Sequence, residues 1–219
     1  MPVLECARCN EMFYSASGST FARCERCGAG VWRVFEDESS FDRVAATPRR
    51  IQPADHAAIV YSDSEEAAAF CGRYVREGLD RDELVIAVLP EPLRTALDGR
   101  LSRRQRGQLR LEEPAVAYGD FEPRRAVAWY EDMMEQADRP MRLLAGPDGD
   151  AAARISLPDW RLFERMVHER IVDLGVTVLC VYDGPSLPAE FIPVASTVHP
   201  LLVQRGGELR RNEEFEWDG

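Results

Sequence analysis

The chain has 219 residues, 45% of them hydrophobic and 30% charged, which suits a folded protein with one ordinary domain and a small appendage. It has no apolar run near the roughly 18 residues that a membrane helix needs and no signal-like N-terminus, so we expect a cytoplasmic protein. The net charge of −11 lies wholly outside residues 1–50, and a chain this acidic lacks the general attraction for phosphate backbones that nucleic-acid binding requires.

All 27 basic residues are arginine, and the chain contains no lysine. This composition excludes enzyme mechanisms that depend on a lysine side chain. A Schiff-base lysine, a P-loop lysine and a kinase lysine are all absent.

Four cysteines come first in the chain, as two C-x-x-C pairs separated by 14 residues, with strand-like segments at 12–14, 20–22 and 31–35. Two such turns place four thiolates around one tetrahedral Zn²⁺, although rubredoxin-like iron uses the same ligands. Disulfides fit a cytoplasmic protein poorly. We predict a structural zinc ribbon over residues 1–36 that needs the metal to fold, because so short a segment buries little core. The predicted ligands are Cys6, Cys9, Cys24 and Cys27.

Residues 37–52 are polar and are predicted to be a linker. From residue 53 onward, apolar strands alternate with amphipathic helices, which predicts an α/β fold: a three-layer αβα architecture with a mostly parallel sheet. In such sheets ligands bind at the carboxyl ends of the strands. The predicted strands are 56–61, 83–89, 109–111, 141–145 and 176–182, with a closing hairpin of 201–203 and 208–210. The predicted helices are 64–78, 92–101, 123–137, 158–174 and 188–198.

Three motifs in this part carry a family resemblance: H-A-A-I-V-Y-S at 56–62, C-V-Y-D at 180–183 and V-H-P at 198–200, the last followed by a Gly-rich turn and Asn212. In this order and spacing, residues 53–217 resemble the MEDS domain, named after the sensory domain of the dichloromethane regulator DcmR. The resemblance implies a RecA/KaiC-like fold, sensing of small hydrocarbon-like ligands, and a place in bacterial signalling or transcription control. The segment A-G-P-D-G-D-A-A-A-R departs from the family pattern.

A RecA-like relative would bind phosphate in the loop after the first strand, here residues 62–66. That loop has neither glycine nor lysine, and it carries the carboxylates of Asp63, Glu65 and Glu66. These carboxylates would repel phosphate, so we predict a degenerate P-loop without NTP hydrolysis.

The polar residues within the family motifs form the predicted ligand site. One interpretation is a pocket lined by tyrosine rings, in which histidine and aspartate orient the ligand. The other, which we favour for each histidine taken singly, is a set of hydrogen-bonded core residues. Metal binding by His56, Cys180 and His199 suits the residue types, but their spacing does not support it. The predicted site residues are His56, Tyr61, Cys180, Tyr182, Asp183 and His199.

Several other chemistry-bearing residues have ordinary structural interpretations. His168 lies in the middle of a predicted helix and is expected at the surface or on a salt-linked helix face. The arginine-rich segment 103–110 is expected to be a solvated face. Cys71 and Trp160 are expected in the core.

The favoured function is a non-enzymatic sensory or regulatory protein, in which the MEDS-like domain binds a small ligand or a signalling protein and the zinc ribbon serves as a docking element. A second hypothesis is a small transcription regulator that contacts nucleic acid through the ribbon, although the charge counts against it. A third is an enzyme that uses Asp183, His199 or Cys180, which no nucleophile–base spacing supports.

Overall fold

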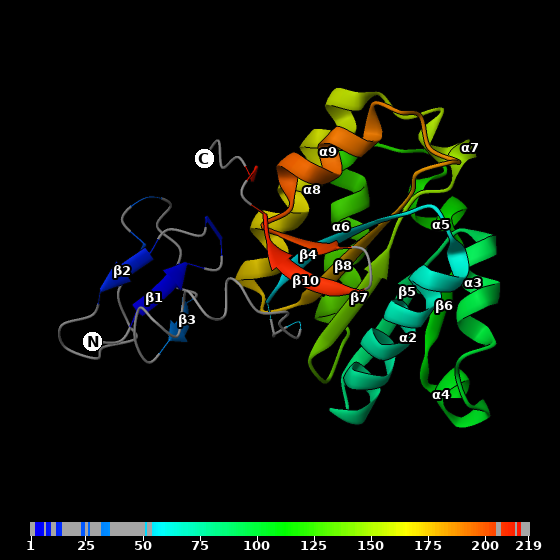
Figure 1. Cartoon of the computed structure of the whole chain (residues 1–219), viewed down its shortest axis with the longest axis horizontal. Coiled ribbons are helices and arrows are strands. Elements are labelled where there is room, and N and C mark those ends of the chain that lie inside the picture. Colours follow the sequence, from blue (N-terminus) through cyan, green and yellow to red (C-terminus); the bar gives the residue numbers. More distant parts are fainter. Residues whose placement is uncertain are drawn as a thin grey trace.

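The computed structural model describes residues 3–6, 8–9, 12–14, 23–24, 26, 32–35, 51, 54–204, 207–212 and 214–215. Two sheets are present in this part of the chain, a small one near the N-terminus and a large one in the body (Figure 1). The small sheet is antiparallel, with the order β2-β1-β3. Its strands are β1 (Val3–Cys6), which was not predicted, β2 (Met12–Tyr14) and β3 (Trp32–Phe35).

The large sheet has seven strands in the order β10-β9-β4-β8-β7-β5-β6. Its neighbouring strands are parallel except for the hairpin of β9 and β10. The central strands are apolar and buried, as expected for a parallel sheet between two helical layers. The strands are β4 (His56–Tyr61), β5 (Leu84–Val88), β6 (Arg110–Glu112), β7 (Met141–Ala145), β8 (Thr177–Asp183), β9 (Leu201–Gln204) and β10 (Glu208–Arg211).

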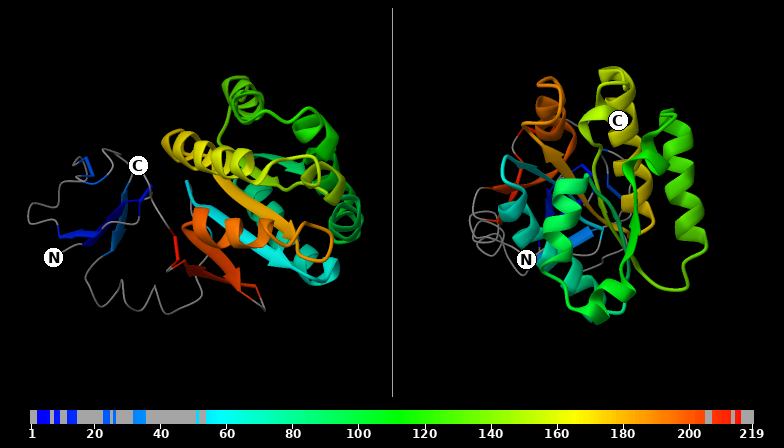
Figure 2. Two further views of the ribbon diagram at one scale, coloured as in Figure 1. Left: turned by 90° about the horizontal axis from the view of Figure 1, so that it is seen from above. Right: turned by 90° about the vertical axis from the view of Figure 1, so that its right-hand side faces the viewer.

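Helices cover both faces of this sheet, which confirms the predicted three-layer α/β fold class (Figure 2). None of the described helices combines the length and apolar character that a bilayer crossing requires. One face is covered by α2 (Ser64–Asp80) and α3 (Glu91–Asp98), with α4 (Arg103–Gln108) beside them. The other is covered by α5 (Pro114–Tyr118), α6 (Pro123–Glu135), α7 (Gly149–Ala152), α8 (Leu157–Asp173) and α9 (Phe191–Val198).

The loop after β4 is closed by its own side chain. The Asp63 carboxylate accepts hydrogen bonds from the backbone amides of Glu65 and Glu66, at 2.8 and 3.4 Å. These amides belong to the first turn of α2, where unpaired backbone N–H groups are a ready site for an anion. The protein's own carboxylate therefore takes the place of the anion.

A buried ion pair lies on the face covered by α2. Arg142 Nε donates to Glu83 at 2.5 Å, and the guanidinium stacks 4.5 Å from the centre of the Tyr74 ring. The Tyr74 hydroxyl lies 2.9 and 3.0 Å from the carbonyls of Leu143 and Thr177. Each polar group in this set has partners, as buried polar groups require.

Candidate functional site

The structure divides the six predicted site residues between the two faces of the sheet. In β4 and β8, Val60 pairs with Tyr182, and Tyr61 pairs with Asp183. Successive side chains of a strand point to opposite faces, so Tyr61 and Tyr182 point away from each other. The face covered by α8 holds His56, Cys180, Tyr182 and His199, whereas Tyr61 lies on the face covered by α2, with Asp183 beside it.

Four buried polar side chains converge between β4, β8 and α8, and we call them the core cluster: His56, Glu164, Cys180 and His199. Glu164 Oε2 lies 3.4 Å from His199 Nε2 and 3.6 Å from Cys180 Sγ. His56 Nε2 lies 3.8 Å from Glu164 Oε2 and 3.4 Å from Cys180 Sγ. One ligand-type atom from each of the four lies within 4.8 Å of all the others, and none of the four residues is more than 6% exposed.

Glu164 is the member of the core cluster that the sequence interpretation missed. It lies on α8 between Trp160 and His168 at four-residue spacing, so the three residues share one helix face. Its Oε1 atom accepts a 2.5 Å hydrogen bond from the Tyr182 hydroxyl, to which Trp160 Nε1 donates at 3.4 Å. An acidic residue on the otherwise apolar face of this helix was the available signal, because a carboxylate is seldom fully buried without a partner.

The outer nitrogens of the two cluster histidines are hydrogen-bonded, and this fixes their tautomers. His199 Nδ1 donates to the carbonyl of Ala195 at 3.0 Å. His56 Nδ1 lies 3.3 Å from His168 Nδ1, and His168 Nε2 bonds to the carbonyl of Arg8. A carbonyl can only accept, so His168 carries its proton on Nε2 and accepts from His56 Nδ1–H. In His56 and His199 alike, Nε2 therefore presents a lone pair to the interior of the cluster.

One of these lone pairs is unsatisfied. His199 is fully buried, and its Nε2 has no hydrogen-bond partner among the residues that the structure describes. The nearest group is the Glu164 carboxylate, which is another acceptor. A buried polar atom without a hydrogen bond carries a desolvation cost, so the contact between His199 Nε2 and Glu164 needs a proton or a cation to stabilise it.

His168 is not at the surface, so the expectation from its mid-helix position was wrong. It is 1% exposed and is covered by the cysteine-bearing N-terminal segment. Arg8 also donates through its guanidinium to the carbonyl of Glu169 at 3.2 Å, and the Phe215 ring lies edge-on, 5.3 Å from His168. The periodicity of one helix does not reveal that segments distant in the chain cover it.

Burial controls protonation within the core cluster. It lowers the pKa of His56 well below its ordinary value, and the nearby His199 and His168 add to the effect. Burial raises the pKa of Cys180 well above its ordinary value, with a further contribution from the charge of Glu164. His56 and Cys180 are therefore neutral at neutral pH. Within the described part of the chain, no arginine contacts Glu164.

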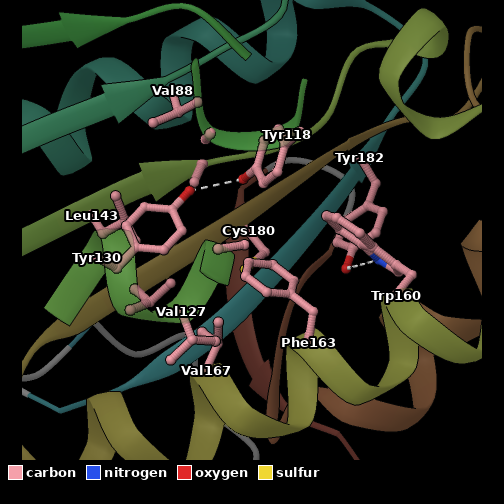
Figure 3. Close-up of a cluster of buried hydrophobic side chains, with 14 of the residues drawn as sticks. Val88, Tyr118, Val127, Tyr130, Leu143, Trp160, Phe163, Val167, Cys180 and Tyr182 are labelled. Carbon is pink, nitrogen blue, oxygen red and sulfur yellow. Dashed lines mark hydrogen bonds between the residues drawn. The ribbon is translucent and has the colours of Figure 1, made fainter. Parts of the chain in front are cut away.

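Aromatic side chains fill the space beside the core cluster. Figure 3 shows Cys180 and Tyr182 among the rings of Tyr130, Phe163 and Trp160, which come from α6 and α8. The cavity that remains there is about 10 Å³, room for at most one water molecule. The space beside the core cluster therefore holds no organic ligand.

An open groove lies instead at the carboxyl end of β4, between α2, α9 and β9. Its volume is about 490 Å³, and its walls are mainly apolar. The hydroxyl of Tyr61 is buried in this wall and has no hydrogen-bond partner among the described residues. Burial, with a contribution from Asp183, raises the pKa of Tyr61, so its phenol stays neutral. The apolar walls come from Ile59, Val60, Ala67, Phe70, Pro185, Ile192 and Val203.

Three of the four predicted zinc ligands lie in the described residues and converge. Cys6, Cys9 and Cys24 are buried, and their sulfurs lie within 4.8 Å of one another. Cys9 Sγ and Cys24 Sγ are 3.5 Å apart, close to the roughly 3.8 Å between thiolates around tetrahedral zinc. Cys27, most of the predicted linker 37–52 and the expected strand 20–22 lie outside the described residues. The donor set that is described fits zinc.

Comparison with known proteins bears on the body of the chain. Residues 55–200 match the MEDS domain, described as the methanogen/methylotroph, DcmR sensory domain. The chain belongs to the MEDS family. The comparison with curated proteins found no match. Among solved structures, the flagellar accessory protein FlaH from Methanocaldococcus jannaschii is similar, with 14% identity and a TM-score of 0.48, over 84% of this chain and 89% of that chain.

The MEDS assignment confirms the family that the sequence motifs indicated. It makes residues 55–200 a sensory domain. The core cluster lies within these residues, as does most of the groove beside Tyr61, although Val203, Gln204 and Gly207 of the groove follow residue 200. The N-terminal cysteines lie outside the matched range.

Proposed function

We propose that this protein is a non-enzymatic sensory protein whose MEDS domain binds a small, mostly apolar ligand in the groove beside Tyr61. The observation that carries the proposal is the buried Tyr61 hydroxyl, which lacks a partner in the described structure and lies in an apolar wall. A groove of about 490 Å³ is within the range of small-molecule sites, where one or two polar groups orient an otherwise apolar ligand. A hydrocarbon derivative with a single acceptor atom has the matching chemistry.

The arrangement of the polar residues argues against the enzyme hypothesis. Asp183 accepts a 2.9 Å hydrogen bond from Ser186, whereas Cys180 and His199 belong to the core cluster beneath α8. Catalysis requires a nucleophile and a base within hydrogen-bond reach of one another and of the substrate. These three residues do not meet in the groove.

For the N-terminal segment we propose a structural zinc ribbon, with Cys27 as the fourth ligand, that docks a signalling protein. Contacts between the N-terminal segment and the body of the chain support a role in which a change in one part is passed to the other. The Arg8 carbonyl binds His168, and Glu5 lies 3.9 Å from Arg211 of β10. A change in α8 or β10 would therefore reach the cysteine-bearing turn. The net charge of −11 disfavours nucleic acid as the partner.

Ligand binding is testable by thermal shift with a panel of short alcohols and haloalkanes. We expect at least one compound to raise the melting temperature of the wild type, because a ligand that binds only the folded state stabilises it. Tyr61→Phe should weaken that compound about five- to tenfold, the value of one hydrogen bond. Tyr118→Phe, at a buried tyrosine outside the groove, is the matched control. Unchanged binding in both Tyr61→Phe and the groove-filling Ile192→Trp would refute the proposal.

Docking through the ribbon requires a separate experiment. Affinity capture from the native host would compare the wild type with Cys24→Ser/Cys27→Ser. We expect a signalling protein to be lost only from the double variant. An unchanged set of partners would reject the ribbon as the docking element.

A further inference from the structure

We infer that the core cluster is a second metal site, in which His56, Glu164, Cys180 and His199 bind one Zn²⁺ ion inside the MEDS domain. It draws no residue from the groove beside Tyr61. The inference therefore stands or falls independently of ligand binding there.

The geometry of the core cluster fits a tetrahedral ion. Around zinc, with bonds of about 2.0 Å to nitrogen or oxygen and 2.3 Å to sulfur, neighbouring ligand atoms lie roughly 3.3–3.6 Å apart. Glu164 Oε2 lies 3.4 Å from His199 Nε2, 3.6 Å from Cys180 Sγ and 3.8 Å from His56 Nε2. The separation of His56 Nε2 and Cys180 Sγ is 3.4 Å. All four atoms lie within 4.8 Å of one another, so side-chain shifts of about 1 Å would bring them to bonding distance of one ion.

The tautomers also fit metal binding. A histidine that ligates a metal donates its other ring nitrogen to a carbonyl, a carboxylate or another outer partner. His199 does so to the Ala195 carbonyl, and His56 does so to His168, which in turn donates to the Arg8 carbonyl. Both Nε2 lone pairs consequently face the cluster, as an ion requires.

Charge balance gives an independent reason. A thiolate at Cys180 and a carboxylate at Glu164 together neutralise one divalent cation, and a bound ion deprotonates a coordinating thiol. The resulting site is neutral overall and can be buried without an arginine counter-ion. Two imidazoles, one thiolate and one carboxylate are all established zinc donors.

The competing interpretation is a purely hydrogen-bonded core network. It accounts for the bonds from Tyr182 to Glu164 and from His56 to His168. It leaves His199 Nε2, which is fully buried, without a hydrogen bond in the described part of the chain, with the Glu164 carboxylate 3.4 Å away as its nearest polar group. A metal ion supplies the missing partner.

A zinc ion held by four protein atoms has no open coordination position, which is typical of structural rather than catalytic sites. It would tie α8 to β4, to β8 and to the segment that follows α9. Through His56, His168 and the Arg8 carbonyl, it would also be joined to the turn that carries Cys6 and Cys9.

The test is the zinc content of the full-length protein, measured by mass spectrometry after exhaustive dialysis. We expect about two equivalents in the wild type, one at each cysteine-containing site, and about one in Cys180→Ser/Glu164→Gln. Cys24→Ser/Cys27→Ser, which disables the N-terminal site, should retain about one equivalent. Cys71→Ser, at a buried cysteine outside both sites, should match the wild type.

A spectroscopic measurement covers the possibility that the core variant does not fold. Zinc X-ray absorption of Cys24→Ser/Cys27→Ser should show one sulfur and three nitrogen or oxygen neighbours. The inference is wrong if Cys180→Ser/Glu164→Gln folds and keeps the full metal content of the wild type. It is equally wrong if Cys24→Ser/Cys27→Ser folds without metal, or with more than one sulfur around the ion. Iron or cobalt in place of zinc would overturn the choice of ion.

Discussion

The two faces of the large sheet bury polar groups in different ways. Beneath α2, Arg142 pairs with Glu83, and the Tyr74 hydroxyl bonds to two backbone carbonyls. Beneath α8, the core cluster gathers a carboxylate, a thiol and two imidazoles, and His199 Nε2 has no partner in the described structure. The Tyr61 hydroxyl, on the α2 face, also has no partner among the described residues, but it lies in the wall of the open groove, whereas His199 Nε2 lies inside the closed core cluster. A buried polar group with all its partners present is explained by the architecture, and one without a partner needs a further explanation.

The largest expected effect on stability comes from the ion pair of Arg142 and Glu83 on the α2 face. Arg142→Met should lower the free energy of unfolding by about 3–5 kcal/mol, because it removes the buried partner of Glu83 and leaves that carboxylate only the partly exposed Arg81, 3.9 Å away. Urea denaturation measures the loss, which added zinc should not restore. Arg139→Met is the control, since its pair with Asp82 is exposed and worth about 0–1 kcal/mol. Equal effects of the two variants would contradict the structural role of Arg142.

The next largest effect concerns the tyrosine of the same face. Tyr74→Phe should cost about 1–3 kcal/mol, because it removes a buried hydroxyl whose single proton is shared between two carbonyls. The loss should be the same with and without a chelator. A destabilisation that depends on metal would show that the two faces are not as distinct as their hydrogen bonding indicates.

Glu164→Gln tests the other face. In chelator-treated protein we expect the free energy of unfolding to change by at most about 1 kcal/mol. The glutamine side chain can still accept the hydrogen bond from Tyr182, and the variant no longer has to bury a carboxylate. In untreated protein the variant should melt at a lower temperature than the wild type, since it loses a metal ligand. The difference between the two conditions is the measurement, made by differential scanning calorimetry. Large and equal losses in both would assign Glu164 to architecture alone.

The smallest expected signal is the reaction of Cys71 with iodoacetamide. Burial raises the pKa of its thiol to about 12, so at pH 8 almost no reactive thiolate exists in the folded protein. Mass spectrometry should find Cys71 unmodified in buffer and alkylated in urea. The raised pKa also means that its contribution to folding is complete below about pH 9 and declines as the pH rises toward 12. Modification under native conditions would show that this face opens.

Much of the fold was predictable because its signals are local. Strand–helix alternation, the carboxylates of 62–66 and the C-x-x-C pairs each lie within short stretches of sequence. The helices α4, α5 and α7 were not predicted, because they are only six, five and four residues long and have almost no periodicity to detect. The alternation of strands and helices also predicted that a ligand site would lie at the carboxyl ends of the strands, and the groove beside Tyr61 lies at that edge of the sheet.

The core cluster could not be predicted in the same way. Its four members come from two strands, one helix and the segment after another helix, and only the strand register brings His56 close to Cys180. The histidines and Cys180 were recognised as candidates by residue type, but Glu164 and His168 were not. Their roles depend on what covers α8, and that cover includes the Arg8 carbonyl from the far end of the chain.

The Asp63 cap has a consequence for what such a protein can respond to. Its carboxylate already holds the amides of Glu65 and Glu66, so no nucleotide phosphate has to be bound or released for the domain to keep its shape. We expect the conformation of the domain to be indifferent to the ratio of ATP to ADP in the cell.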